Sequence, residues 1–236
     1  MPRRKRPPDT QRSEHWLRVA VNEKQIHLDL RVSKLFGFEA GDRITWLSPV
    51  KSDGYAEYFD QEFLDRLGLD SLEFPLTAFW PRSGPRWDGL AKTASGKYIL
   101  VEAKAYIEEA VDYRSKASPD SLEKIRRALS DAKKAFRAVD AATWESPFYQ
   151  YANRLAHLYF LRQLNGVDAY LLFICFADAP DVPNRCSKQQ WEGAIRLTEK
   201  CLGLGTHPFR DYVSTLIWSV PEMLGGAQRQ VCDGNL

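Results

Sequence analysis

Hydrophobic and polar residues alternate along residues 97–107, KYILVEAKAYI, with the period of two that is typical of a β-strand. One face of this strand is entirely apolar. The other face begins apolar and then carries Glu102 and Lys104 side by side. Charged side chains at positions where a core strand places Leu or Val need partners or a function.

A second short strand precedes this one in the pattern. Residues 85–91 are predicted to be extended, and residues 93–96, TASG, form the turn of a hairpin. This pairing brings Asp88 beside Glu102. Two converging carboxylates are oxygen ligands suited to Mg²⁺ or Mn²⁺, and the ammonium group of Lys104 next to them would stabilise developing negative charge.

The rest of the pattern predicts alternating helices and strands. Residues 169–177 are apolar on both faces, which is typical of a central strand covered by helices on each side. Residues 16–22 favour a helix over a strand, whereas residues 26–32 fit either. We expect short extended structure at 44–47, helices at 55–67, 118–140, 146–164 and 187–202, and further strands at 72–80 and 212–218.

Asp88 followed by Glu102-Ala103-Lys104 in an apolar strand resembles the signature of the PD-(D/E)xK nuclease superfamily. Trp87 stands where the superfamily usually has proline, a departure that removes no ligand. The resemblance covers roughly residues 54–176. It implies an α/β fold with a central mixed β-sheet, helices on both faces and a restriction-endonuclease-like αβββαβ core.

The resemblance also implies a metal-dependent nuclease that hydrolyses phosphodiester bonds in DNA by a Mg²⁺-activated water, with Mn²⁺ as an alternative cation. Asp88, Glu102, the carbonyl of Ala103 and Glu57 would hold the cation, and Lys104 would be catalytic together with the three acids. Glu57 is expected on the helix before the first strand, with Glu62 as its substitute. A solvated acidic helix face is the competing interpretation.

Five residues are candidates for contacts with nucleic acid. Gln150 resembles the glutamine that some members of the superfamily carry on the helix after the catalytic strands. Arginines in loops are more often simply solvated. For His157 a structural role is favoured over a general base. The candidates are Arg82, Arg86, Gln150, Asn153 and Arg154, of which Arg154 would bind a carboxylate or a phosphate.

Composition narrows the picture further. The chain has 236 residues and a formal net charge of +2, so it is not a polycation that coats nucleic acid without discrimination. It has no apolar run of membrane-spanning length, no secretory signal and no C-x-x-C pair, so we expect a cytoplasmic protein with reduced thiols and no membrane partner. The predicted organisation is a disordered basic arm at 1–14, an extension packed on the core at 15–53, a nuclease-like domain at 54–221 and a tail at 222–236.

Two other classes of function fit the same residues. One is a catalytically inactive module of the same fold that binds nucleic acid or protein. The other is an unrelated α/β domain in which Glu102 and Lys104 form a structural ion pair. The sequence leaves open DNA against RNA, and endonuclease against exonuclease action. Cutting both strands of a duplex would favour a homodimer with two active sites.

Overall fold

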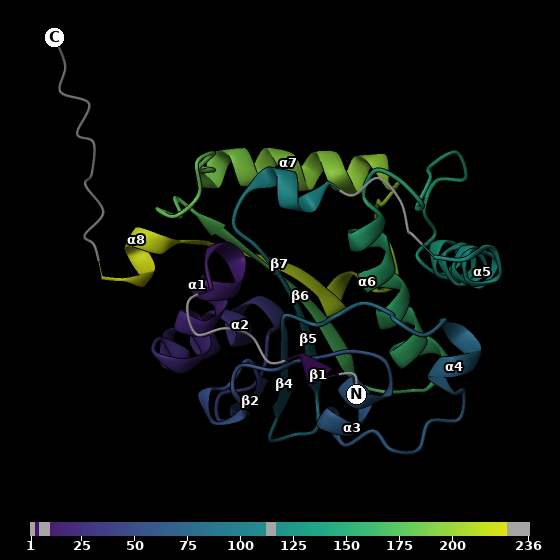
Figure 1. Cartoon of the computed structure of the whole chain (residues 1–236), viewed down its shortest axis with the longest axis horizontal. Helices are drawn as coiled ribbons and strands as arrows, with labels where there is room; N and C mark the ends of the chain where they lie inside the picture. Colours follow the sequence, from purple (N-terminus) through teal and green to yellow (C-terminus); the bar gives the residue numbers. More distant parts are fainter. Residues whose placement is uncertain (1–2, 5–9, 112–116, 226–236) are drawn as a thin grey trace, which may run out of the picture.

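The fold is built around a mixed β-sheet of five strands in the order β2-β4-β5-β6-β7. It is seen in a computed structural model that describes residues 3–4, 10–111 and 117–225 (Figure 1). β2, β4 and β5 pair antiparallel, whereas β5, β6 and β7 pair parallel. The strands are β2 (Ile44–Ser48), β4 (Gly89–Thr93), β5 (Tyr98–Lys104), β6 (Ala169–Ala177) and β7 (Val213–Ser219).

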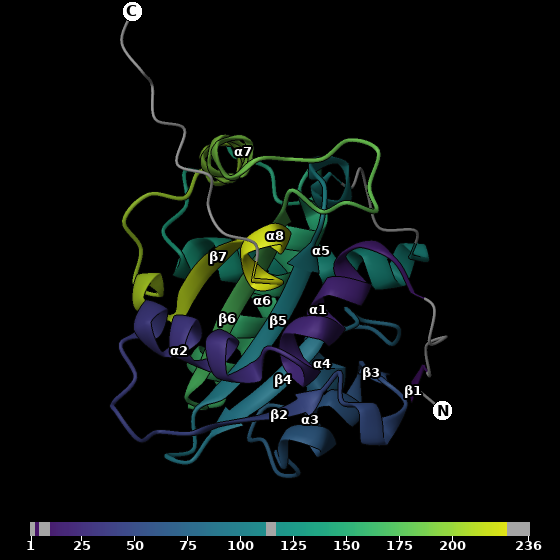
Figure 2. The same ribbon diagram turned by 90° about the vertical axis from the view of Figure 1, so that its left-hand side faces the viewer.

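Helices cover both faces of this sheet (Figure 2). On one face, Val101, Leu172 and Ile174 form a core with helices α1, α2 and α8. On the other face, Leu100 and Phe173 pack with helices α3 to α6, and α7 lies beside them over β6 and β7. The helices are α1 (Arg12–Asn22), α2 (Gln25–Phe36), α3 (Gln61–Leu67), α4 (Leu76–Phe79), α5 (Pro119–Ala135), α6 (Tyr149–Tyr159), which continues as a π-helical turn (Phe160–Leu164), α7 (Lys188–Cys201) and α8 (Val220–Met223).

The parallel half of the fold follows the predicted pattern closely. All nine residues of β6 are buried, as expected of a strand with a core on each side. Local sequence signals explain the helices before and after it. The Ser118 side chain accepts a hydrogen bond from the Ser121 N–H at the start of α5, and Ser187 and Gln190 form a capping box at α7.

The antiparallel half differs from the predictions. The expected strand at 72–80 is wrong, because Leu76, Phe79 and Trp80 are buried at a spacing that suits the short helix α4. The expected helix at 55–67 is wrong in its first part. A short 3₁₀ turn (Lys51–Asp53) precedes that stretch and strand β3 (Glu57–Tyr58) lies within it, and α3 starts only after Asp60, whose φ of 50° is not helical.

Residues 15–53 contribute helices α1 and α2 to one face of the main sheet and strand β2 to the sheet itself. The helix favoured at 16–22 is confirmed as part of α1, and the open segment 26–32 lies in α2. The extended segment at 44–47 is β2, which supplies an edge strand of the main sheet. The first strand and helix of the core therefore come from this part of the chain.

Short elements lie near both ends of the described chain. Within the basic arm expected to be disordered at 1–14, β1 (Arg3–Arg4) pairs with β3, and α1 begins at Arg12; residues 1–2 and 5–9 lie outside the described part. At the other end α8 reaches Met223, and 226–236 lie outside it. Two more 3₁₀ turns complete the described chain, η2 (Ile107–Ala110) and η4 (Arg210–Tyr212).

Among the described residues, none of the helices has the length and the apolar character that a membrane-spanning helix needs.

Candidate functional site

The predicted hairpin of β4 and β5 is confirmed, and it places Asp88 next to the end of β5. Gly89 at the start of β4 pairs with Val101, so Asp88, the residue just before β4, is level with Glu102. The N–H of Ala103 donates a hydrogen bond of 2.8 Å to Asp88 Oδ2. The Asp88 side chain thus accepts a backbone hydrogen bond that a further residue of β4 would otherwise accept. This bond fixes the Asp88 carboxylate at the strand end.

Glu102 lies buried between two cations. Lys104 Nζ donates to Glu102 Oε1 at 2.6 Å, and Arg154 Nε donates to Glu102 Oε2 at 2.7 Å. Burial by itself would raise the pKa of Glu102, but the charges and hydrogen bonds of Arg154 and Lys104 outweigh it and lower this pKa. Glu102 is therefore held ionised with both oxygens engaged.

Arg154 is the most connected side chain of the site. Beside Glu102, it donates to Asn153 Oδ1 at 2.7 Å and to the backbone carbonyl of Arg86 at 2.8 Å. Its guanidinium carbon also lies 4.9 Å from the centre of the Trp87 ring. The sequence suits Arg154 to binding either a carboxylate or a phosphate. Arg154 is only 5% exposed, and its partner in the structure is the carboxylate of Glu102.

Lys104 is the second cation of the site and stays protonated. Burial would lower its pKa, but the negative charges of Glu102 and Asp88 outweigh that effect and raise the pKa. Its Nζ also donates to Gln150 Oε1 on α6 at 2.8 Å. Gln150 therefore orients the lysine beside the acids.

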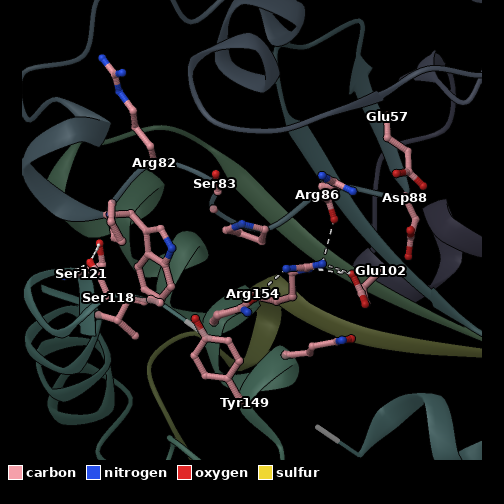
Figure 3. A pocket seen from close by; sticks show the side chains of 18 of the residues that line it. Glu57, Arg82, Ser83, Arg86, Asp88, Glu102, Ser118, Ser121, Tyr149 and Arg154 are labelled. Atoms are coloured by element: carbon pink, nitrogen blue, oxygen red, sulfur yellow. Dashed lines mark hydrogen bonds and ion pairs between the residues drawn. The ribbon is translucent and has the colours of Figure 1, made fainter. Parts of the chain in front are cut away.

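Asp88 carries a carboxyl group with a strongly raised pKa. Burial, followed by the nearby charges of Glu102 and Glu57, raises its pKa to about 8, and Lys104 offsets only part of this rise. The labelled carboxylates of Glu57, Asp88 and Glu102 gather in one region of the cleft (Figure 3). The acids near Asp88 thus outweigh the effect of Lys104, so its protonated form is favoured. The charge of Glu102, in contrast, is balanced by Arg154 and Lys104.

Glu57 reaches the site from a different element than predicted. It lies on strand β3, not on a helix, and β3 is tied to the site by a bridge between Tyr58 and Trp87. Glu57 is 3% exposed and lines the same cleft as Asp88. Glu62 lies on α3 and does not line this cleft, so Glu57 is the better candidate of the two.

A cleft of about 830 Å³ opens over these residues. His157 is not among its lining residues. The ring packs against Trp80 and Phe79, its Nδ1 donates a hydrogen bond to the Asn153 carbonyl, and burial lowers its pKa to about 3, so the structural role expected for it is confirmed. The lining includes the predicted residues Glu57, Arg82, Arg86, Asp88, Glu102, Lys104, Gln150, Asn153 and Arg154.

The oxygen atoms around Asp88 match the chemistry of a hard divalent cation in part. The N–H and C=O of one strand residue point to the same edge of a strand, so the Ala103 carbonyl also faces Asp88. Carboxylates and a carbonyl are the donors that Mg²⁺ and Mn²⁺ take. In the arrangement that the described residues adopt, however, no three His, Cys, Asp or Glu side chains are grouped closely enough to hold a metal ion.

Several lining residues were not predicted from the sequence. Tyr149, Ser118 and Ser121 form a wall of the cleft at the first turns of α5 and α6. A usable signal was present, because helices that follow parallel strands begin near the carboxyl ends of those strands, where ligands bind in open α/β sheets. The sequence marks Ser118 as a helix start, whereas its position over the site depends on the packing of α5 against α6.

No family model, no curated protein and no solved structure matches this chain.

Proposed function

We propose that the protein is a metal-dependent nuclease of the PD-(D/E)xK type that hydrolyses phosphodiester bonds in DNA. The observation that carries the proposal is the convergence of Asp88, Glu102 and Lys104 at adjoining strand ends, in a cleft that Glu57 also lines. Two acids and an amine in this arrangement are suited to cation-assisted hydrolysis of a phosphate ester.

The order of elements supports a restriction-endonuclease-like core. Helix α1, strands β2, β4 and β5, helix α6 and strand β6 occur in the order helix, three strands, helix and strand, with α2, β3, α3, α4 and α5 inserted between them. In this proposal α1 and β2 open the core, in place of the helix and strand expected within residues 55–80. The sheet has the mixed strand directions that such a core requires.

The proposed ligands of Mg²⁺ or Mn²⁺ are Asp88, Glu102, Glu57 and the carbonyl of Ala103. A bound cation would supply a water of lowered pKa and shield charge on the phosphate. Lys104 would stabilise the negative charge that develops in the transition state, and Gln150 holds its amine in place. Arg154 keeps Glu102 ionised and fixes its orientation.

A second function is a catalytically inactive module of the same fold that binds nucleic acid or protein. One observation favours it, since both oxygens of Glu102 already accept hydrogen bonds from Arg154 and Lys104. A structural ion pair would look the same. The two proposals differ in whether Mg²⁺ or Mn²⁺ raises the melting temperature, because a ligand that binds the native state stabilises it.

The experiment that tests the nuclease proposal is incubation of the protein with linear, circular and single-stranded DNA, with and without Mg²⁺ or Mn²⁺. RNA of the same length is included because the sequence does not exclude it. We expect cation-dependent cleavage of at least one substrate. No cleavage of any substrate, together with no effect of either cation on the melting temperature, would favour the inactive module. Gel filtration of the active sample tests the homodimer.

A further inference from the structure

The two walls of the cleft differ in charge. One wall is the loop at 81–86, which contributes the exposed residues Arg82 and Arg86 to the lining of the cleft. The facing wall is built from the first turns of α5 and α6 and presents the hydroxyl groups of Ser118 and Ser121 and the half-buried ring of Tyr149 (Figure 3). It contributes no lysine or arginine in the described chain.

The remaining cations of the lining are already committed. Lys104 and Arg154 both bind Glu102 at the floor of the cleft. Arg82 and Arg86 form no ion pair with an acid in the part of the chain that the structure describes. Among the described residues of the lining, the positive charge that can meet a phosphate therefore lies on one side of the cleft.

The basic wall is held in shape from several directions. The carboxylate of Asp60 accepts hydrogen bonds from the N–H of Ser83 at 2.9 Å and from that of Gly84 at 2.8 Å. The carbonyl of Arg86 accepts a hydrogen bond from Arg154, and the Arg86 guanidinium carbon lies 5.1 Å from the centre of the Phe59 ring. The loop is thus set before any ligand binds, which lowers the entropic cost of binding.

The size and depth of the cleft restrict what can reach the acids. Its volume of about 830 Å³ lies in the range of pockets that enclose a small organic ligand. Such a space holds a short piece of one strand rather than a helix of two. Glu102 is 3% exposed at the floor, so a scissile phosphate has to enter the cleft to approach it.

We infer that the nucleic acid enters this cleft as a single strand, with its phosphates along Arg82 and Arg86 and a base against Tyr149. This inference rests on the nuclease function proposed above and names its substrate class. Proteins that bind single strands combine a cationic track for the backbone with aromatic side chains on which bases stack. A duplex carries phosphates on both of its sides, and the described residues of the wall that holds Ser118, Ser121 and Tyr149 offer them no cation.

Binding without a cation tests the inference independently of cleavage. The full-length protein is titrated, in EDTA, into a fluorescein-labelled oligothymidylate and into a hairpin duplex of equal length, and fluorescence anisotropy is read. An oligouridylate of the same length separates DNA from RNA. The variants are Arg82→Gln and Tyr149→Leu. Their matched controls are Arg127→Gln, which is exposed on α5, and Tyr159→Leu, which is half-buried on α6; neither control residue lines the cleft.

We expect the single strand to bind at least about tenfold more tightly than the duplex. Tyr149→Leu should weaken single-strand binding by about fivefold or more, the effect of losing one stacked base. Arg82→Gln should weaken it and reduce the slope of log affinity against log salt by about 0.7, as the loss of one phosphate contact predicts. Both controls should bind as the unaltered protein does.

The inference is overturned if the duplex binds as tightly as the single strand, if neither binds, or if Tyr149→Leu and Tyr159→Leu have equal effects. Failure of the nuclease proposal gives a different result. In that case the single strand still binds through Arg82 and Tyr149, but added Mg²⁺ or Mn²⁺ produces no cleavage. Cleavage of duplex and single strand at equal rates would leave the nuclease standing and remove the single-strand preference.

Discussion

Arg154 Nε donates a hydrogen bond of 2.7 Å to Glu102 Oε2 at a point where both side chains are almost fully buried. The pair joins α6 to the end of β5, and the same guanidinium holds the carbonyl of Arg86 on the loop before β4. One side chain therefore connects three segments that are distant in sequence. Its removal should disturb both the fold and the proposed chemistry.

Arg154→Met should destabilise the protein strongly. It leaves the carboxylate of Glu102 buried with Lys104 as its remaining cation, and loss of one partner of a buried pair costs about 3–5 kcal/mol. The free energy of unfolding from urea titration measures the effect. The control is Arg126→Met, which removes an exposed pair with Glu145 and should cost less than about 1 kcal/mol. Equal losses in the two variants would show that the Arg154 pair does not hold the fold.

Asp88→Asn should stabilise the cation-free protein at alkaline pH. The pKa of Asp88 is raised from 3.8 to about 8, so the folded state favours the protonated carboxyl group. The stability that this group contributes is present below pH 4 and is lost as pH rises through about 8. Asparagine copies the neutral form and can still accept the Ala103 N–H.

Thermal unfolding in EDTA measures this effect. Near pH 8 the Asp88→Asn variant should melt at least about 2 °C above the unaltered protein, and near pH 4 the difference should shrink. The exposed Asp140→Asn variant serves as the control and should melt like the unaltered protein at both values. A lower melting temperature for Asp88→Asn near pH 8 would contradict the repulsion among Asp88, Glu102 and Glu57.

His157 should make the protein sensitive to acid. Burial lowers the pKa of His157 from 6.5 to about 3, so the folded state favours the neutral ring. The stability that it contributes is present above pH 6.5 and is lost as pH falls from there through about 3. His157→Phe keeps an aromatic ring among Trp80, Phe79 and Phe63 and removes the titration.

The slope of unfolding free energy against pH between about pH 6.5 and pH 4 tests this prediction. The slope should be shallower in His157→Phe than in the unaltered protein. It should be unchanged in His27→Gln, because His27 is exposed on α2. If His157→Phe and the unaltered protein lose stability in parallel, the burial of His157 does not control the acid response.

Much of the parallel half of the fold was predictable because its signals are local. Residues 169–177 are apolar throughout, and the helix starts at Ser118 and Ser187 are read from a few neighbouring positions. The hairpin that joins Asp88 to Glu102 was also predictable from its alternation and its turn. These local features bring together most of the candidate site.

The remaining features depend on contacts between distant segments. Glu57 lies in a two-residue strand that exists because β1 and Trp87 pair with it, and no periodicity marks so short an element. The spacing of Leu76, Phe79 and Trp80 fits a helical turn, but aromatic residues in the surrounding segment also fit a strand. The partner of Glu102 was open as well, since Arg154 suits a carboxylate and a phosphate equally well in sequence.

The most direct test of the central claim is the rate of DNA cleavage in Mg²⁺ or Mn²⁺ by Asp88→Ala and Lys104→Ala. Lys92→Ala, an exposed lysine on β4, is the matched control, and circular dichroism checks that each variant is folded. We predict that cleavage is lost in both site variants and retained in the control. Folded Asp88→Ala and Lys104→Ala proteins that still cleave DNA would contradict the assignment of these residues to a catalytic site.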